Sequence, residues 1–165
     1  MKKQKGFSLI ELLIVVAIIL IIAAIAIPNL LRSRMAANEA SAVGSLRTIN
    51  TAEVTYSTTY PNIGFSADLK SLGGTAATCA AATGAAAANA CLIDDVLSTT
   101  GVKSGYTFTA VGTAGTGSAL LVTYASKALP SVVGQSGQRA FCSDQSGVIR
   151  YNATGTACTN TDPAL

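Results

Sequence analysis

The sequence predicts an α+β protein in which one long amino-terminal helix packs on a small carboxyl-terminal antiparallel sheet. Three observations support this fold class. An apolar run occupies Phe7–Ile27, hydrophobic residues then recur with helical period as far as Thr59, and segments with period-two alternation follow from Gly105 onward. The chain has 165 residues, so the part beyond the helix has the size of one modest domain.

The apolar run is polar only at Ser8 and Glu11. About 20 apolar residues in a helix are enough to cross a bilayer, so this segment is expected to span a membrane. Three lysines and no acidic residue precede it, namely Lys2, Lys3 and Lys5. The positive-inside rule then places the short amino-terminal end in the cytoplasm and the rest of the chain outside.

Two residues distinguish this run from an ordinary anchor. A carboxylate at membrane depth costs roughly 2.5–3.5 kcal/mol, so Glu11 needs a partner unless it lies near the membrane surface and is hydrated. Gly6 would give a processing enzyme close access to the backbone. Cleavage between Gly6 and Phe7 would create an amine four residues before Glu11, which could pair with this carboxylate in the same chain or in a neighbouring chain.

The segments KGFSLIELLIVVAII and AAIAIP resemble the amino-terminal signature of type IV pilins and of the related type II secretion pseudopilins. The resemblance implies cleavage after Gly6 by a prepilin peptidase, N-methylation of Phe7 and a role for Glu11 in subunit docking. It also implies a helical homopolymer that is assembled by an inner-membrane platform and an ATPase. A secretory signal peptide is disfavoured, because the run is too long and lacks a small-x-small cleavage site.

These features divide the chain into a cytoplasmic leader (1–6), a long helix (7–59) and a globular head (60–165). Within the helix, 7–27 is expected to form the membrane span and later the filament core, and 28–59 to be amphipathic. Pro28 removes a backbone hydrogen bond, which predicts a kink near Ala24–Pro28.

The amphipathic half of the helix presents one hydrophobic face, formed by Met35, Ala42, Leu46, Ile49 and Tyr56. Polar residues are expected largely elsewhere on the helix: Arg32, Arg34, Asn38, Glu39, Arg47 and Glu53. The helix is expected to end before Pro61, because proline disfavours helical backbone at the residue that precedes it.

The stretch between the helix and the sheet predicts only short elements. Ser66 is a candidate N-cap for a helical piece at Ala67–Leu72 that Gly73 ends. An alanine-rich loop lies between Cys79 and Cys91, with at most one or two helical turns. A further helical turn is expected around Leu92–Leu97.

Four strands are expected in the head, in GYTFTAVG, SALLVTYAS, QRAFCSD and GVIRY. Alternation places Tyr106, Phe108 and Ala110 on one face of the first strand, and Leu120, Val122 and Tyr124 on one face of the second. In the last two strands, Phe141 and either Val148 or Ile149 are expected to point inward.

The head contains four cysteines and the chain has no histidine. In an exported domain an even number predicts two disulfide bonds, with three possible connectivities. Proximity along the chain favours Cys79–Cys91 and Cys142–Cys158. A metal site is disfavoured, because the cysteines are not in CxxC pairs and no histidine accompanies them. The resemblance implies that the second bond ties a closing carboxyl-terminal loop to the sheet.

Charge and composition argue against several functions. Three of the eleven Lys and Arg residues precede Gly6, and the remaining eight equal the eight Asp and Glu residues, so no basic patch for nucleic acid is indicated. Without histidine, and with cysteines committed to disulfides, no enzyme or cofactor site is predicted. The resemblance to pseudopilins makes Asp144 and Asp162 candidate calcium ligands. Nothing in the sequence determines the geometry between them. Asn152 begins an N-glycosylation sequon.

Two functions of the resembled families are compatible with the sequence, and a membrane-anchored enzyme is a remote third. The first is the structural subunit of a type IV pilus, used for adhesion, twitching motility or DNA uptake. The alternative is the major pseudopilin of a type II secretion system. In either case the precursor is expected in the inner membrane with a periplasmic head; the pilin would then reach the cell surface.

Overall fold

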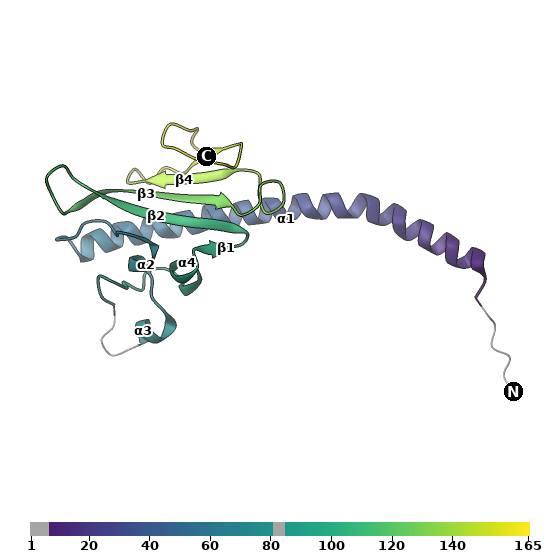
Figure 1. Ribbon diagram of the computed structural model, residues 1–165, viewed down its shortest axis with the longest axis horizontal. Coiled ribbons are helices and arrows are strands. Elements are labelled where there is room, and N and C mark those ends of the chain that lie inside the picture. Colours follow the sequence, from purple (N-terminus) through teal and green to yellow (C-terminus); the bar gives the residue numbers. More distant parts are fainter. Residues whose placement is uncertain (1–6, 81–84) are drawn as a thin grey trace. The chain divides into compact units, whose positions relative to one another are not determined.

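The computed structural model describes residues 7–80 and 85–165. The chain divides into two units, one that ends at Arg34 and a second that comprises Met35–Leu165. The helix α1 (Leu9–Thr59) contributes to both units, and every other element belongs to the second. The order of a long helix, short helices and an antiparallel sheet agrees with the predicted α+β class (Figure 1).

The sheet contains five strands in sequential order, each antiparallel to its neighbour. Such a meander needs only short connections, which the glycine-containing turns supply. The strands are β1 (Val102–Lys103), β2 (Tyr106–Ala114), β3 (Leu121–Pro130), β4 (Ala140–Asp144) and β5 (Arg150–Asn152). The β2–β3 pair is the longest and forms the hairpin whose loop lies at the left-hand end of Figure 1.

The core of the second unit lies between the sheet and the later half of α1. The helix contributes a buried row at spacings of three, four and seven, namely Ala42, Leu46, Ile49 and Tyr56, as its periodicity predicts. The sheet contributes Tyr106, Phe108, Ala110 and Phe141 from the opposing face. Met35 is only half-buried, since it stands at the boundary of this unit.

Three short helices connect α1 to the sheet: α2 (Leu69–Leu72), α3 (Ala76–Ala80) and α4 (Asp95–Thr99). The predicted cap of the first was wrong. Asp68, not Ser66, precedes α2, and its carboxylate accepts the Ser71 N–H at 2.8 Å. Ser66 is instead committed to a buried contact with α1. The last short helix lies three residues later than predicted, after Asp94 rather than from Leu92.

The strand predictions need three corrections. The short strand β1 was not predicted, because two residues show no alternation. Val122 is 46% exposed, since the pairing of β2 with β3 shifts between Thr113 and Ala114 and leaves Val122 as an extra residue without a partner on β2. The last strand begins at Arg150 rather than Gly147; Ile149 packs on the core while Val148 is exposed, which settles the inward residue.

Two carboxylates were placed wrongly. Glu39 and Glu53 were expected away from the hydrophobic face of α1, yet both are buried. Hydrophobic periodicity assigns charged residues to the solvent by default, and it cannot recognise a carboxylate whose partner lies far along the chain.

Candidate functional site

The amino-terminal end of α1 holds the predicted processing and docking residues. Glu11 is the third residue of α1, and its carboxylate accepts the N–H of Ser8 at 2.9 Å. This is one of the two bonds of a capping box, and it satisfies a backbone donor at the start of the helix. Phe7 directly precedes Ser8 and is 77% exposed. Gly6 and the leader lysines lie outside the described residues.

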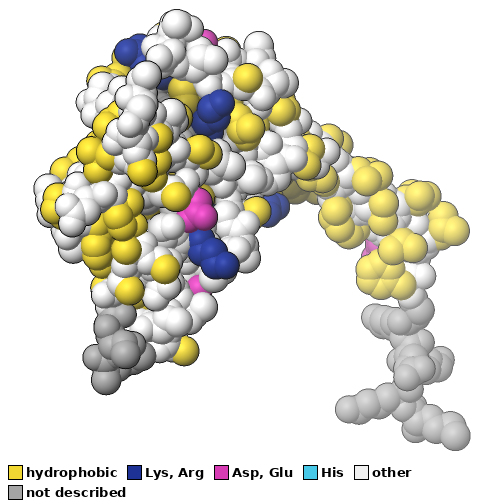
Figure 2. Space-filling model, turned by 60° about the vertical axis from the view of Figure 1, so that its left-hand side comes forward, with side chains coloured by type: hydrophobic (Ala, Val, Ile, Leu, Met, Phe, Trp, Pro, Cys, Tyr) yellow, Lys and Arg dark blue, Asp and Glu magenta, His cyan; other side chains and the backbone are white. Residues whose placement is uncertain are grey.

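In the part of the first unit that the structure describes, the apolar side chains have no buried packing partner. Its large apolar side chains, from Leu9 to Leu31, are all exposed, and hydrophobic side chains cover this part of the helix in Figure 2. Among the described residues, α1 is the one helix long and apolar enough to cross a membrane. A surface of this size is stable only in lipid or against other apolar helices.

Pro28 lies inside α1, and the helix continues through it to Thr59. Because proline has no N–H, one carbonyl of the preceding turn lacks its helical hydrogen-bond donor, yet the helix does not end there. The predicted kink at this position remains a prediction.

Comparisons with known proteins bear on this segment. Residues 1–27 match the family described as the prokaryotic N-terminal methylation motif. The chain is 64% identical over 39 residues to the type IV wide pilus major component PilA4 of Thermus thermophilus. It is 44% identical over 54 residues to the type IV major pilin protein PilA of Myxococcus xanthus.

Its relatives are type IV major pilins. The matched regions cover 24% and 33% of this chain, and less than a third of each relative, 30% and 24% respectively. The likeness to these relatives therefore covers at most a third of the chain, and no solved structure matches the chain. The long helix packed on an antiparallel sheet is nevertheless a type IV pilin-like α+β fold.

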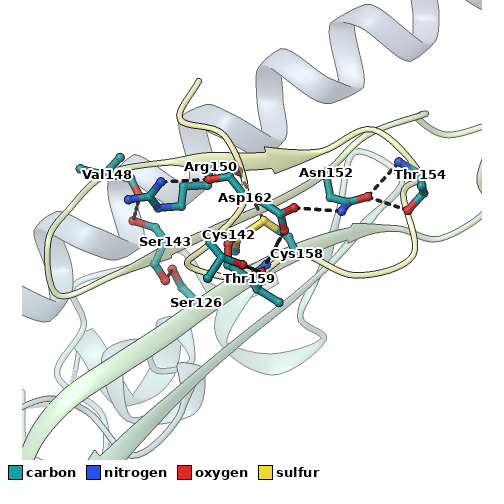
Figure 3. The surroundings of a disulfide bond; sticks show 11 residues. Ser126, Cys142, Ser143, Val148, Arg150, Asn152, Thr154, Cys158, Thr159 and Asp162 are labelled. Atoms are coloured by element: carbon teal, nitrogen blue, oxygen red, sulfur yellow. Dashed lines mark hydrogen bonds between the residues drawn. A yellow bond between two sulfur atoms is a disulfide. The ribbon is translucent and has the colours of Figure 1, made fainter.

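The head of this pilin-like chain is closed by two disulfide bonds, Cys79–Cys91 and Cys142–Cys158. This is the pairing that proximity along the chain favoured, and it leaves no free cysteine. Cys142 and Cys158 are buried, and their bond holds the carboxyl-terminal loop against β4 and β5 (Figure 3). The bond between Cys79 and Cys91 closes the alanine-rich loop, and α3 ends at Ala80, where this loop begins.

Asp162 organises the closing loop. Its carboxylate accepts the Thr159 N–H at 2.7 Å and the Asn152 side-chain amide at 3.1 Å (Figure 3). Hydrogen bonding to the Thr159 backbone, set against a smaller desolvation effect, holds the pKa of this carboxyl below its usual value. The Asn152 amide of the sequon is thus already bonded, and its carbonyl oxygen accepts the Thr154 N–H at 2.9 Å.

The possible calcium ligands are not assembled into a metal site. The Asp144 carboxylate accepts the Ser146 N–H at 2.9 Å, while Asp162 is bonded within the closing loop. In the part of the chain that the structure describes, no three His, Cys, Asp or Glu residues are grouped as a metal would require. The same two carboxylates instead stabilise turns.

An ion pair supported by backbone hydrogen bonds joins α1 to the segment that leads into β4. Glu39 accepts the N–H groups of Gln138 and Arg139 at 2.9 and 3.1 Å. Its second oxygen forms an ion pair with the Arg139 guanidinium at 2.8 Å. Arg139 also lies over the rings of Phe141 and Tyr151. Sequence reasoning missed this contact, because its partners are about 100 residues apart.

Opposing effects act on the pKa of Glu39. Burial raises it, but the backbone hydrogen bond from Gln138 and those from Arg139 outweigh burial, so the pKa lies below its ordinary value. Glu39 is therefore ionised in the folded head, and its contribution to stability is present above the unfolded-state pKa and lost as pH falls through the folded-state pKa.

A second helix-to-sheet contact is centred on Asn50. Its amide donates to the Ser143 hydroxyl at 2.8 Å, and its carbonyl oxygen accepts the Tyr124 hydroxyl at 3.1 Å. The Ser143 hydroxyl in turn donates to the Val148 carbonyl at 3.1 Å. This network fixes the turn after β4 on α1.

Replacing both Cys142 and Cys158 with serine should destabilise the head by about 3 kcal/mol, since the bond restricts the unfolded chain. The carboxyl-terminal loop should also lose amide protection first. Urea unfolding of the full chain in detergent micelles, with hydrogen exchange, would measure both effects. The matched control replaces Cys79 and Cys91: stability should fall by a similar amount, but protection of 159–165 should remain. Undiminished protection in the Cys142/Cys158 variant would contradict the assigned role.

Proposed function

We propose that this chain is the major structural subunit of a type IV pilus. The observation that carries the proposal is the matched methylation motif at the start of a helix whose first part, from Leu9 to Leu31, leaves its large apolar side chains exposed, followed by a disulfide-closed head. A filament core would bury that surface against other copies of the same helix. The role is structural rather than catalytic, in keeping with relatives that are named as pilus components.

The proposed pathway starts in the inner membrane with the head in the periplasm. A prepilin peptidase cleaves after Gly6 and then methylates Phe7. The cleavage removes the leader that holds the amino terminus in the cytoplasm. The Phe7 amine and Glu11 of a neighbouring subunit then form a charge pair. Such a pair is stronger in an apolar core than in water and would fix the axial register. An assembly platform and an ATPase extract the subunit from the membrane.

The test is the intact mass of the chain in a sheared cell-surface fraction, with electron microscopy of the same sample. A chain that begins at methylated Phe7 in long filaments would support the proposal. A processed chain retained in the cell envelope would favour a secretion pseudopilin instead. A chain that begins at Met1 would overturn the assignment of the processing site.

Replacing Gly6 with a bulkier residue such as leucine should leave the precursor uncleaved in the membrane, because a side chain blocks close approach to the scissile backbone. Membrane fractions analysed by mass spectrometry would show a chain that retains all three leader lysines. Gln4→Ala, also in the leader but two residues from the cleavage point, should be processed normally. Efficient cleavage of Gly6→Leu would show that glycine is dispensable at this position.

A further inference from the structure

Glu53 is a buried carboxyl group that the proposed function leaves without a role. Its side chain is fully buried, as is its partner Ser66. Oxygen Oε2 accepts the Ser66 N–H at 2.8 Å, and Oε1 lies 2.7 Å from the Ser66 hydroxyl. The contact joins α1 to the segment that follows it, 13 residues further along the chain.

The hydrogen atoms at this contact can be counted. The Ser66 hydroxyl is also 3.1 Å from the Asp68 carbonyl oxygen, yet it has one hydrogen to donate. If Glu53 is ionised, that hydrogen serves either the carboxylate or the carbonyl. If Glu53 is protonated, it donates to the Ser66 hydroxyl, which donates onward to Asp68. All three oxygens are then satisfied.

The surroundings of Glu53 also favour the neutral form. The ion pairs among the described residues are Glu39–Arg139 and Asp94–Lys103, and neither involves Glu53. Among the described residues, the titratable side chains that interact electrostatically with it are Tyr56 on α1 and Tyr124 on β3, and neither is a cation. Burial raises the pKa of Glu53, and the hydrogen bonds from Ser66 only partly oppose this effect.

The segment held by Glu53 supports the tip of the long hairpin. The Phe65 N–H donates to the Leu121 carbonyl at 2.9 Å, and the Leu121 N–H donates to the Ile63 carbonyl at 2.8 Å. On the other strand the Gly112 N–H reaches the Ala67 carbonyl at 3.3 Å. Residues 63–67 therefore connect both strands of the β2–β3 hairpin to α1 through one buried carboxyl group.

We propose that Glu53 is a proton-dependent latch: it carries a proton in the folded head, and its ionisation as the pH rises loosens residues 63–67 and the hairpin tip from α1. An ionised Glu53 would remain buried with only the two Ser66 donors and no cation beside it, whereas opening the segment lets water reach the carboxylate. The latch is a property of the head and does not depend on the proposed pilus function.

The chain contains three glutamates, Glu11, Glu39 and Glu53, which makes the test direct. The full chain in detergent micelles is labelled with ¹³C at glutamate side-chain carboxyls and titrated by NMR from about pH 4 to about pH 9. The Glu53 signal, assigned by its loss in Glu53→Gln, should stay protonated after the Glu39 signal has ionised. A Glu53 midpoint at the ordinary glutamate value of about 4.3 would overturn the proposal.

Hydrogen exchange at the Ser66 amide provides a second readout. After correction for the intrinsic pH dependence, protection should fall about tenfold per pH unit once Glu53 ionisation drives opening. Glu53→Gln should abolish this loss, because the neutral amide can donate to the Ser66 hydroxyl at every pH. The same slope in the parent chain and in Glu53→Gln would refute the latch. If Glu53→Gln does not fold, Glu11→Gln and Glu39→Gln assign the parent signals by elimination.

Discussion

Glu11→Ala should leave the chain cleaved and methylated but exclude it from filaments. The side chain is exposed in the described monomer, where it contacts the Ser8 N–H, so its removal should not disturb the head. In the proposed filament the carboxylate is paired with the Phe7 amine of another subunit. Loss of a charge pair that contributes about 3 kcal/mol would lower the equilibrium constant for adding each subunit about a hundredfold. Sheared filaments and membranes would be compared by mass spectrometry and microscopy.

The control for this prediction is Glu11→Gln, which keeps an oxygen to accept the Ser8 N–H but removes the charge. If the charge pair sets the register, Glu11→Gln should fail in assembly as Glu11→Ala does. Filaments from Glu11→Gln but not from Glu11→Ala would show that capping of α1 is the essential property. Normal filaments from both would refute the docking role.

Glu39→Gln should destabilise the head by about 2 kcal/mol, which is the scale for losing hydrogen bonds to a charged group. The amide keeps one oxygen for the Gln138 and Arg139 N–H groups, but the Arg139 guanidinium loses its counter-charge. We do not expect the larger cost of breaking a fully buried pair, because the Arg139 side chain is 39% exposed. Urea unfolding followed by near-ultraviolet circular dichroism would measure the loss.

The pH dependence of this variant gives a further check. In the parent chain, stability should fall as acid protonates Glu39, whose folded-state pKa is lowered. The stability of Glu39→Gln should lack this acid-dependent loss. Arg47→Gln is the matched control, since Arg47 is exposed on the same helix and has no ion pair among the described residues; its effect should stay within about 0.5 kcal/mol. A change no larger in Glu39→Gln than in Arg47→Gln would exclude the assigned anchoring role.

The sequence was sufficient for features that local patterns encode. The apolar run, the helical face from Ala42 to Tyr56 and the alternation of Tyr106, Phe108 and Ala110 follow from periodicity alone, and the structure bears them out. The disulfide pairing followed from closeness along the chain. The amino-terminal motif could be recognised because its residues are contiguous.

The sequence was insufficient where an interaction joins distant segments. Ser66 was assigned to a helix cap because serine is common there, but the buried carboxyl of Glu53 competes for it. Glu39 resembled an ordinary surface charge until Arg139 was placed beside it. The exposure of Val122 depends on the register shift near the hairpin tip, where Val122 is the extra residue of β3, and alternation within one strand does not show where its pairing shifts.

The last residues of the chain have a consequence for solubility. The Tyr151 N–H donates to the Pro163 carbonyl at 3.0 Å, and the Leu165 N–H donates to the Ile149 carbonyl at 2.9 Å, so the tail pairs along the outer side of β5. An uncovered strand at that position would offer its backbone to any other extended chain and promote aggregation. In the proposed filament, the tail would therefore keep the backbone of β5 from pairing with the sheet of a neighbouring head.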